Sequence, residues 1–178
     1  MTIIVEDGTG KANAESYCTV AFADQYFSAR NIPSWAAVGT DATKESLLRA
    51  ATDYMEQVYR MRWAGARTTS TQALSWPRYA VPLKDYPGGY AGFPSYVANN
   101  VVPDAVQRAC AELALRAISG PLAPDIGRIK SRTKIGPIEV DYVQGASAVT
   151  KFRAVDNMVG IYFGGSGGSS MNIPLARA

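Results

Sequence analysis

The amino-acid sequence predicts a mainly α protein: a small bundle of three to four main helices with a β-hairpin and a flexible C-terminal arm. Apolar residues recur at three- and four-residue spacing in long segments, as in amphipathic helices. Two adjacent short segments alternate with a period of two, as strands do. With 178 residues, 47% of them hydrophobic, we expect one helical domain over residues 1–163, followed by a Gly/Ser linker and docking tail over residues 164–178.

The first half of the chain predicts two helices. Thr19 is placed to cap a helix over about 20–30, and Asn31-Ile32-Pro33 ends it. A longer helix follows over about 41–61, and it is the best candidate for the centre of the core. Its predicted buried stripe has members at spacings of four, three and four residues, Leu47, Ala51, Tyr54 and Val58, and is widened by Leu48, Met55 and Tyr59.

The middle of the chain predicts a short helical turn and then a long loop. Thr69 and Gln72 match a capping box, so we expect a turn of helix before Trp76-Pro77-Arg78. The loop over residues 79–101 is rich in Gly, Pro and Tyr and has no clear period. A loop of this length either folds back on its own domain or is ordered by a partner. Its candidate partner-binding residues are Tyr86, Tyr90, Phe93 and Tyr96.

The second half predicts a third main helix, a hairpin and a last short helix. The helix begins at Pro103 and ends before Gly120-Pro121. Period-two alternation over residues 128–143 predicts two strands that turn near Gly136-Pro137. Apolar residues over 152–163 predict the last helix.

Four basic residues alternate along the first predicted strand of the hairpin: Arg128, Lys130, Arg132 and Lys134. On a strand they share one face at intervals of about 6.8 Å, so the ladder is able to follow a phosphate backbone as a nucleic-acid-facing surface. The same charges also suit a protected edge strand, or cross-strand pairing with Glu139 and Asp141. The net charge is only +3, and the excess lies in the C-terminal third.

The composition argues against an enzyme. The chain has no histidine, which excludes imidazole bases and His-ligated zinc sites. Cys18 and Cys110 are far apart in sequence and are expected to be buried free thiols. The segment Gly8–Lys11 has glycines and a lysine but lacks the full pattern of a phosphate-binding loop. Asp53 and Glu56, three residues apart on a predicted helix, fit a solvated helix surface better than a catalytic acid/base pair. We expect no cofactor and no metal, no membrane association, and a cytoplasmic product because no export signal is present.

One cluster has the composition of a single-stranded nucleic-acid binder. Arg60, Arg62, Arg67 and Arg78 surround Trp63 and Trp76 in the sequence, and such binders combine stacking rings with cations. Arginine stems that pack on tryptophans at a domain surface produce the same pattern, and the structural interpretation is favoured.

The C-terminal tail joins a flexible linker to an apolar tip. Gly and Ser dominate residues 164–170, and the tip at 171–178 carries one positive charge. A tethered apolar tip is typical of a docking arm, although a frayed terminus is the alternative. The candidate partner-binding residues of the tip are Met171, Ile173 and Leu175.

Taken together, several segments resemble one family of tailed-phage and prophage morphogenesis clusters, labelled a DnaT-like single-stranded-DNA-binding domain. The resemblance spans about residues 3–143 and leaves the tail outside it. It is carried by Ile4–Gly10 with Asn13–Tyr17, Ala23–Phe27, Ala50–Tyr54, the Gln72–Arg78 box, Val102-Pro103 with Glu112–Ala114, and Ile135–Tyr142.

The resemblance implies two functions. The first, which we prefer, is a head-to-tail adaptor or head completion protein of the phage neck, a ring of about twelve copies that docks on the portal and surrounds the passing double-stranded DNA. It implies homo-oligomerisation, a portal protein and a tail-side neck or terminator protein as partners, and location in the virion after assembly in the host cytoplasm. The alternative is a single-stranded-DNA-binding replication protein. The resemblance implies no catalytic residue.

Overall fold

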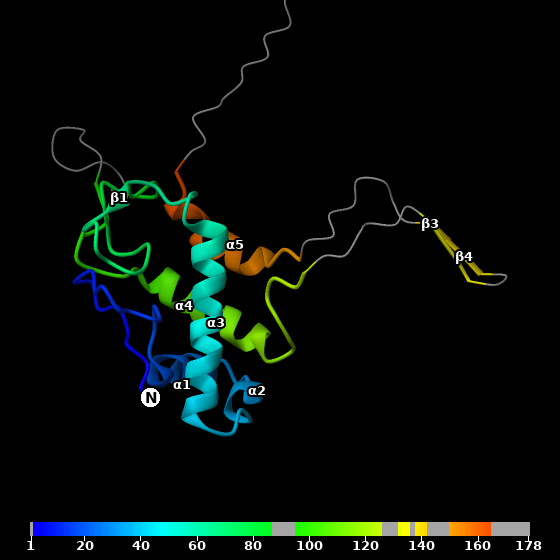
Figure 1. The fold of residues 1–178 in the computed structure, drawn as a ribbon. Helices are drawn as coiled ribbons and strands as arrows, with labels where there is room; N and C mark the ends of the chain where they lie inside the picture. Colours follow the sequence, from blue (N-terminus) through cyan, green and yellow to red (C-terminus); the bar gives the residue numbers. More distant parts are fainter. Residues whose placement is uncertain (1, 87–94, 126–131, 136–137, 142–149, 165–178) are drawn as a thin grey trace, which may run out of the picture.

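The computed structural model describes residues 2–86, 95–125, 132–135, 138–141 and 150–164 (Figure 1). Over these residues the protein is mainly helical with a two-stranded antiparallel hairpin, which confirms the predicted fold class. The elements in chain order are α1 (Val20–Ser28), α2 (Pro33–Ala36), α3 (Asp41–Tyr59), β1 (Ala66–Arg67), β2 (Arg78–Tyr79), α4 (Asp104–Ala117), β3 (Arg132–Ile135), β4 (Ile138–Asp141), α5 (Arg153–Val159) and the 3-10 turn η2 (Gly160–Tyr162).

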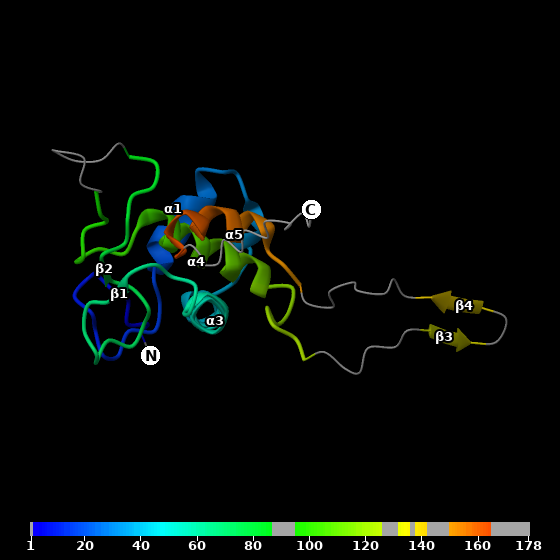
Figure 2. The same cartoon turned by 90° about the horizontal axis from the view of Figure 1, so that it is seen from above.

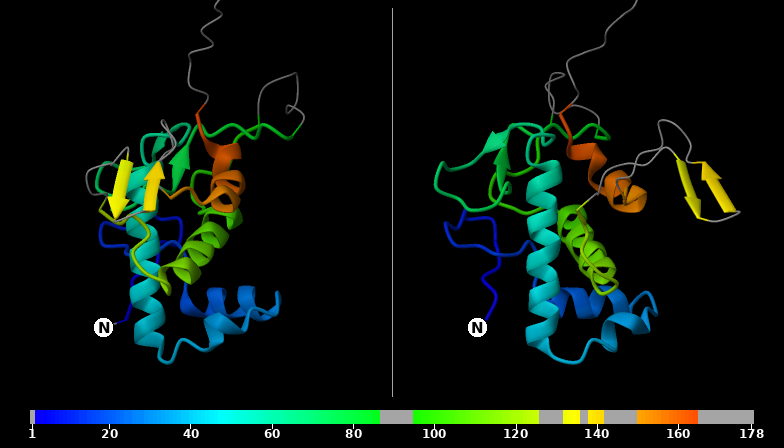
Figure 3. Two further views of the ribbon diagram at one scale, coloured as in Figure 1. Left: turned by 90° about the vertical axis from the view of Figure 1, so that its right-hand side faces the viewer. Right: turned by 45° about the vertical axis from the view of Figure 1, so that its right-hand side comes forward.

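The pair α3 and α4 forms the centre of the bundle. α4 packs against α3 on one side and against α5 on another, and α1 contacts both α3 and α4. Figure 3 shows α1 and α2 at the N-terminal end of α3 and α5 near its C-terminal end. The residues with no exposed surface are shared among these helices, so one continuous apolar core joins them: Ala23, Leu48, Met55, Tyr59, Val106, Leu113, Val155 and Val159.

The buried face of α3 is largely the predicted one. Ala51 and Tyr54 of the predicted stripe are buried, and so are the residues that widen it, Leu48, Met55 and Tyr59. Leu47 is only half-buried, and Val58 is 37% exposed. Thr52 is the buried residue of α3 that the apolar pattern did not predict. Its hydroxyl donates to the carbonyl of Leu48 at 2.9 Å and so enters the core with its hydrogen bond made.

The caps of the helices match their sequence signals. Thr19 Oγ1 accepts the amide of Phe22 at 3.0 Å and begins α1, as predicted. Thr40 does the same for α3 by accepting the amide of Thr43. Pro103, the predicted first helical residue, is the N-cap of α4, so the helix begins one position later at Asp104, where a negative charge in the first turn is favoured.

Two local predictions were wrong. Pro33 ends no helix but begins the short α2, because proline is tolerated in the first turn. The capping box forms without its helix: Thr69 N donates to Gln72 Oε1 at 2.9 Å and Gln72 N donates to Thr69 Oγ1 at 3.2 Å. The Gln72 amide then donates to the carbonyls of Leu74 and Pro77, which holds this stretch in an irregular turn.

Short strand pairings brace the ends of the long loop. β1 pairs antiparallel with β2, a pairing that the sequence analysis did not predict. Beyond β2, Leu83 N donates to Ser95 O and Val97 N donates to Val81 O, so residues 81–83 and 95–97 form a paired stem. The predicted hairpin is present as β3 and β4, with Ile135 opposite Ile138, and Figure 2 shows it apart from the helices.

Candidate functional site

Trp63 and Trp76 lie in the core and not on the surface. They are 5% and 0% exposed, and their rings meet edge to face with centroids 5.6 Å apart. Tyr59, Tyr162 and Phe163 pack around them. A nucleic-acid base needs an exposed ring face on which to stack. These two tryptophans therefore offer no stacking platform, which agrees with the structural interpretation of the cluster but places the rings deeper than a domain surface.

Arg78 is a buried structural side chain. Its Nε donates to the carbonyl of Ala64 at 2.7 Å, and its terminal nitrogens donate to the carbonyls of Ser75, Trp63 and Gly65 at 3.2, 3.4 and 2.8 Å. These bonds join the turn after α3 to the Trp76-Pro77 segment. Because its donors are directed at backbone oxygens, Arg78 is not available to a phosphate.

Arg60 and Arg62 remain at the surface. Arg62 lies over the ring of Phe163, 4.1 Å from its centroid, and 3.7 Å from Asp156. Arg60 lies 4.0 Å from Glu56, and Met61 between them is 94% exposed. The part of the predicted cationic cluster that solvent reaches is therefore at the C-terminal end of α3.

Glu6 fills the turn that looks like part of a phosphate loop. Its Oε1 accepts the amides of Gly8 and Gly10, both at 2.9 Å, and its Oε2 accepts the amide of Lys11 at 2.8 Å. Amides arranged in this way bind an anion. Here the anion is the protein's own buried carboxylate, so the turn is a structural element of the N-terminal segment.

Glu56 is not the solvated helix-surface residue that the sequence suggested. It accepts the hydroxyl of Tyr17 and both the amide and the hydroxyl of Ser75, at 2.9 and 2.7 Å. Burial, together with the charge of Glu56, raises the pKa of Tyr17 well above its usual value. Glu56 thus joins α3 to the segment before α1 and to the Trp76 segment, while Asp53 is exposed.

Cys18 and Cys110 are buried free thiols, as predicted. Thr52 Oγ1 lies 3.4 Å from the sulfur of Cys110, and Ser16 Oγ lies 3.9 Å from it. No three Cys, Asp or Glu side chains of the described residues gather as a metal site requires. None of the helices in the described part of the chain has the length and apolar character of a membrane span.

The long loop presents tyrosines to solvent from its paired stem. Tyr79, Tyr86 and Tyr96 are 51%, 60% and 52% exposed, and Tyr96 pairs with Pro82 within the stem. Lys84 Nζ donates to the carbonyl of Phe163 at 2.5 Å and ties the stem to η2. Of the four predicted contact residues of the loop, Tyr86 and Tyr96 are described, whereas Tyr90 and Phe93 lie outside the described residues.

The basic ladder is described in part. The register places Arg132 opposite Asp141 and Lys134 opposite Glu139, which is the arrangement that cross-strand charge pairing requires. Arg128 and Lys130 lie outside the described residues. So do Met171, Ile173 and Leu175 of the predicted docking tip.

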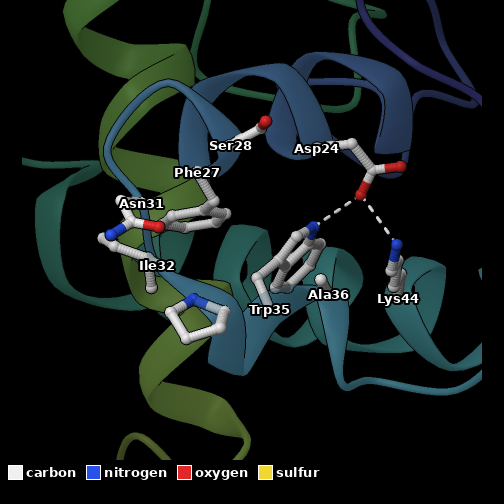
Figure 4. A pocket seen from close by; sticks show the side chains of 9 residues that line it. Asp24, Phe27, Ser28, Asn31, Ile32, Trp35, Ala36 and Lys44 are labelled. Carbon is white, nitrogen blue, oxygen red and sulfur yellow. Dashed lines mark hydrogen bonds and ion pairs between the residues drawn. The ribbon is translucent and has the colours of Figure 1, made fainter.

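The structure also reveals a polar cluster that the sequence analysis missed. Asp24 Oδ1 accepts the indole N–H of Trp35 at 2.7 Å and the ammonium group of Lys44 at 2.8 Å, beside a depression of about 400 Å³ (Figure 4). Phe27 and Ile32 form its apolar side. The three polar groups satisfy one another, so the cluster holds α1, α2 and α3 together. Its only sequence signal was Trp35 beside Pro33, inside the stretch interpreted as a helix end.

Among the comparisons with known proteins, the match is to a protein family. Comparison with curated proteins and with solved structures returned no match. The chain matches the family described as "Putative DnaT-like ssDNA binding protein" over residues 1–178, so the match extends beyond the span of 3–143 that the sequence motifs indicated. The long loop and the C-terminal tail lie within the matched region. The chain therefore belongs to this DnaT-like family.

Proposed function

We propose that the chain is a non-catalytic structural component of a tailed-bacteriophage neck, a subunit of a head-to-tail adaptor ring of about twelve copies that docks on the portal. Its further partners are a tail-side neck or terminator protein and the double-stranded DNA that passes through the lumen. It assembles in the host cytoplasm and ends in the virion.

The observation that carries this proposal is the exposure of three tyrosines around a hydrogen-bonded stem. A loop that folds back on its own domain buries its aromatic rings, whereas Tyr79, Tyr86 and Tyr96 each expose half or more of their surface. Tyrosine is enriched in protein interfaces because it combines a large apolar ring with a polar tip. The paired stem holds these residues in place before any partner arrives, which lowers the entropic cost of binding.

The hairpin supports the same proposal. Figure 2 shows β3 and β4 apart from the helices, and an isolated two-stranded hairpin is at best marginally stable in water. Neighbouring copies in a ring stabilise such an element by covering it. In this proposal Arg128, Lys130, Arg132 and Lys134 face the lumen, and pairing of Arg132 and Lys134 with acidic residues moderates their charge so that DNA slides.

Co-sedimentation with the portal ring of the same genome tests the proposal. We expect the chain to sediment with the portal, and the double substitution of Tyr86→Ser and Tyr96→Ser to weaken binding by about tenfold or more, because the tyrosines are buried in the contact. Ile118→Ser is the matched control, because Ile118 is 42% exposed and lies at the C-terminal end of α4, whereas the loop precedes the N-terminal end of this helix. Equal binding by all variants would count against the tyrosine surface, and no binding by the unmodified chain would count against the adaptor.

The family description supports single-stranded-DNA binding as a second candidate. The surface available for it is Arg60, Met61 and Arg62 with the loop tyrosines. Fluorescence anisotropy of a labelled oligonucleotide tests single-stranded-DNA binding. If the function is correct, the affinity falls as the salt concentration rises and falls on Arg60→Ala and Arg62→Ala substitution. All three tryptophans are buried, so quenching of tryptophan emission is not the readout to use. No anisotropy change at low salt would exclude this function.

A further inference from the structure

A groove runs between the N-terminal segment and the start of α4. Its volume is about 830 Å³, about twice that of the depression beside Asp24. Two short stretches supply most of its apolar lining, Ile3 with Val5 on one side and Val101 to Pro103 on the other, and Phe22 of α1 adds a ring. The charged groups of its rim are already paired: Asp7 with Lys11 of the same lining at 2.8 Å, and Asp104 with Arg108 at 3.1 Å.

The two sides of the groove are held at a fixed separation. Gly8 has φ +100°, and a Cβ at this position would lie 2.0 Å from the carbonyl oxygen of Asn100, so only glycine allows the two segments to approach this closely. Glu6 fixes the turn that carries Gly8 by accepting three of its amides. The groove is therefore preformed and does not depend on the binding of a ligand for its shape.

The N-terminal side of the groove has a backbone edge that is free in part. Ile4 O accepts the amides of Glu15 and Ser16, and Glu6 N donates to Ser16 O, so one edge of the segment is already paired. Backbone groups alternate in direction along an extended chain, so those of Ile3 and Val5 face the other way. On that side Val5 O accepts the ammonium group of Lys11 at 3.0 Å, whereas within the described residues the amides of Ile3 and Val5 have no hydrogen-bond partner. These two amides are available to an added extended peptide.

The tip of the chain, residues 171–178, has the chemistry that this groove requires. Met171, Ile173 and Leu175 alternate with Asn172 and Pro174, so in an extended conformation they share one face. Proline has no amide, which leaves the amides of Ile173 and Leu175 to pair with an edge. Arg177 is the only charged side chain of the tip, so the fit rests on the apolar side chains and on the backbone amides.

We propose that the groove between residues 3–7 and 101–107 binds the tip 171–178 of a second copy of this chain in extended form. The tail leaves the body at Gly164, whose amide donates to Arg62 O, and the six residues between Gly164 and the tip reach about 20 Å. The proposal therefore requires the groove of the adjoining copy to lie within this reach of Gly164, and every copy then gives one tip and receives another, as in a heterologous ring. The proposal rests on the self-association in the proposed function, but not on portal binding.

Photo-cross-linking between isotopically distinct copies tests the proposal. The full chain carries p-benzoylphenylalanine in place of Ile173 and is mixed with ¹⁵N-labelled unmodified chain, with and without the portal ring. We expect cross-links from position 173 to residues 3–7 or 101–107 of the labelled copy. The matched probe in place of Ser169, in the linker, is expected to give no preferred product.

Two lysine variants distinguish an effect at the groove from a general effect of charge on the protein surface. Val101→Lys places an ammonium group in the apolar lining of the groove and is expected to lower the cross-link yield by about tenfold, which corresponds to about 1.4 kcal/mol. Ile118→Lys introduces the same change at another exposed apolar residue and is expected to leave the yield unchanged. Thermal unfolding checks that both variants are folded.

The remaining outcomes overturn the inference. Cross-links within one copy, to another surface, or equally from positions 169 and 173 contradict it, and so does the absence of any cross-link. If the chain still sediments with the portal in that case, the adaptor proposal stands and only the tail assignment fails. If the chain shows no portal binding while the tip still cross-links to the groove, the adaptor proposal fails and the groove assignment stands.

Discussion

Arg78 has the sequence context of a nucleic-acid-binding residue, but its guanidinium group binds backbone carbonyls inside the protein. Four backbone carbonyls accept from its guanidinium, and the same pattern recurs with opposite charge at Glu6, which accepts three amides. Glu56 of α3 is a third example, because it accepts hydrogen bonds from the hydroxyl groups of Tyr17 and Ser75. These residues hold irregular segments together, so their substitution affects stability before it affects any ligand.

Replacement of Arg78 by Met is expected to lower the free energy of unfolding by about 3 kcal/mol, because it leaves buried carbonyl groups without donors. Urea unfolding followed by circular dichroism measures the change. Arg60→Met is the control, since Arg60 is at the surface and a surface ion pair contributes about 1 kcal/mol or less. Equal stability of the two variants would show that Arg78 is not a structural residue.

Stability is expected to fall as the pH rises above 10. Burial raises the pKa of Tyr17 and of Tyr59 above the usual value for tyrosine, and their acceptors Glu56 and Asp156 add to this effect. In the unfolded chain a tyrosine loses its proton at a pKa of about 10, whereas the buried phenols of the folded state keep theirs to higher pH. The stabilisation from each phenol is therefore fully present below about pH 10. Above that pH the free energy of unfolding falls by about 1.4 kcal/mol per pH unit for each group.

Urea unfolding between pH 8 and pH 11 measures this slope. Tyr17→Phe removes one titrating group and is expected to make the loss less steep. Tyr86→Phe, at a tyrosine that is 60% exposed, is expected to leave the slope unchanged. A flat profile for the unmodified protein would mean that neither phenol is buried as described.

At the scale of elements, periodicity predicted the helices and most of their buried residues. The spacing of apolar residues identified α1, α3 and α4, and Thr19 identified the start of α1, because these signals are local. On α3 the pattern wrongly included Val58 and missed Thr52, a polar residue that enters the core through a hydrogen bond to the carbonyl four residues before it. β1 and β2 pair across eleven or more positions in sequence, and a two-residue pairing leaves no pattern to recognise.

Two alanine substitutions on α3 test which of its residues are buried. Leu48→Ala is expected to lower the free energy of unfolding by about 3 kcal/mol, because Leu48 is fully buried and a cavity remains. Val58→Ala is expected to lower it by less than about 1 kcal/mol, because the side chain is already 37% exposed. Chemical denaturation measures the free energy of unfolding of both variants. A larger loss for Val58→Ala than for Leu48→Ala would mean that Val58 is buried, as the sequence predicted.

The candidate site was harder to predict than the fold. Arginines beside tryptophans look the same whether they bind DNA or build a core, and only the packing of η2 over Trp63 and Trp76 decides between them. Tyr86 and Tyr96 were named as candidate partner-binding residues because they lie in a long, tyrosine-rich loop without a period, and both are exposed in the structure. The paired stem beneath them was not predicted, because its partners are separated by the loop itself.

For the whole molecule, three features combine into one account. The helical bundle supplies a rigid body, the stem presents exposed tyrosines beside η2, and the hairpin stands apart from the helices (Figure 2). A subunit of a ring is able to bury exposed aromatic rings and an isolated hairpin against its neighbours, and a monomer has no such neighbours. The account therefore depends on assembly.

Electron microscopy of the purified chain mixed with the portal ring of the same genome tests that dependence most directly. The account predicts an added ring of density below the portal, with the tyrosine stem at a contact between subunits or with the portal. Bare portal rings at a large excess of the chain would contradict the account, and the single-stranded-DNA-binding function would then be the one to pursue.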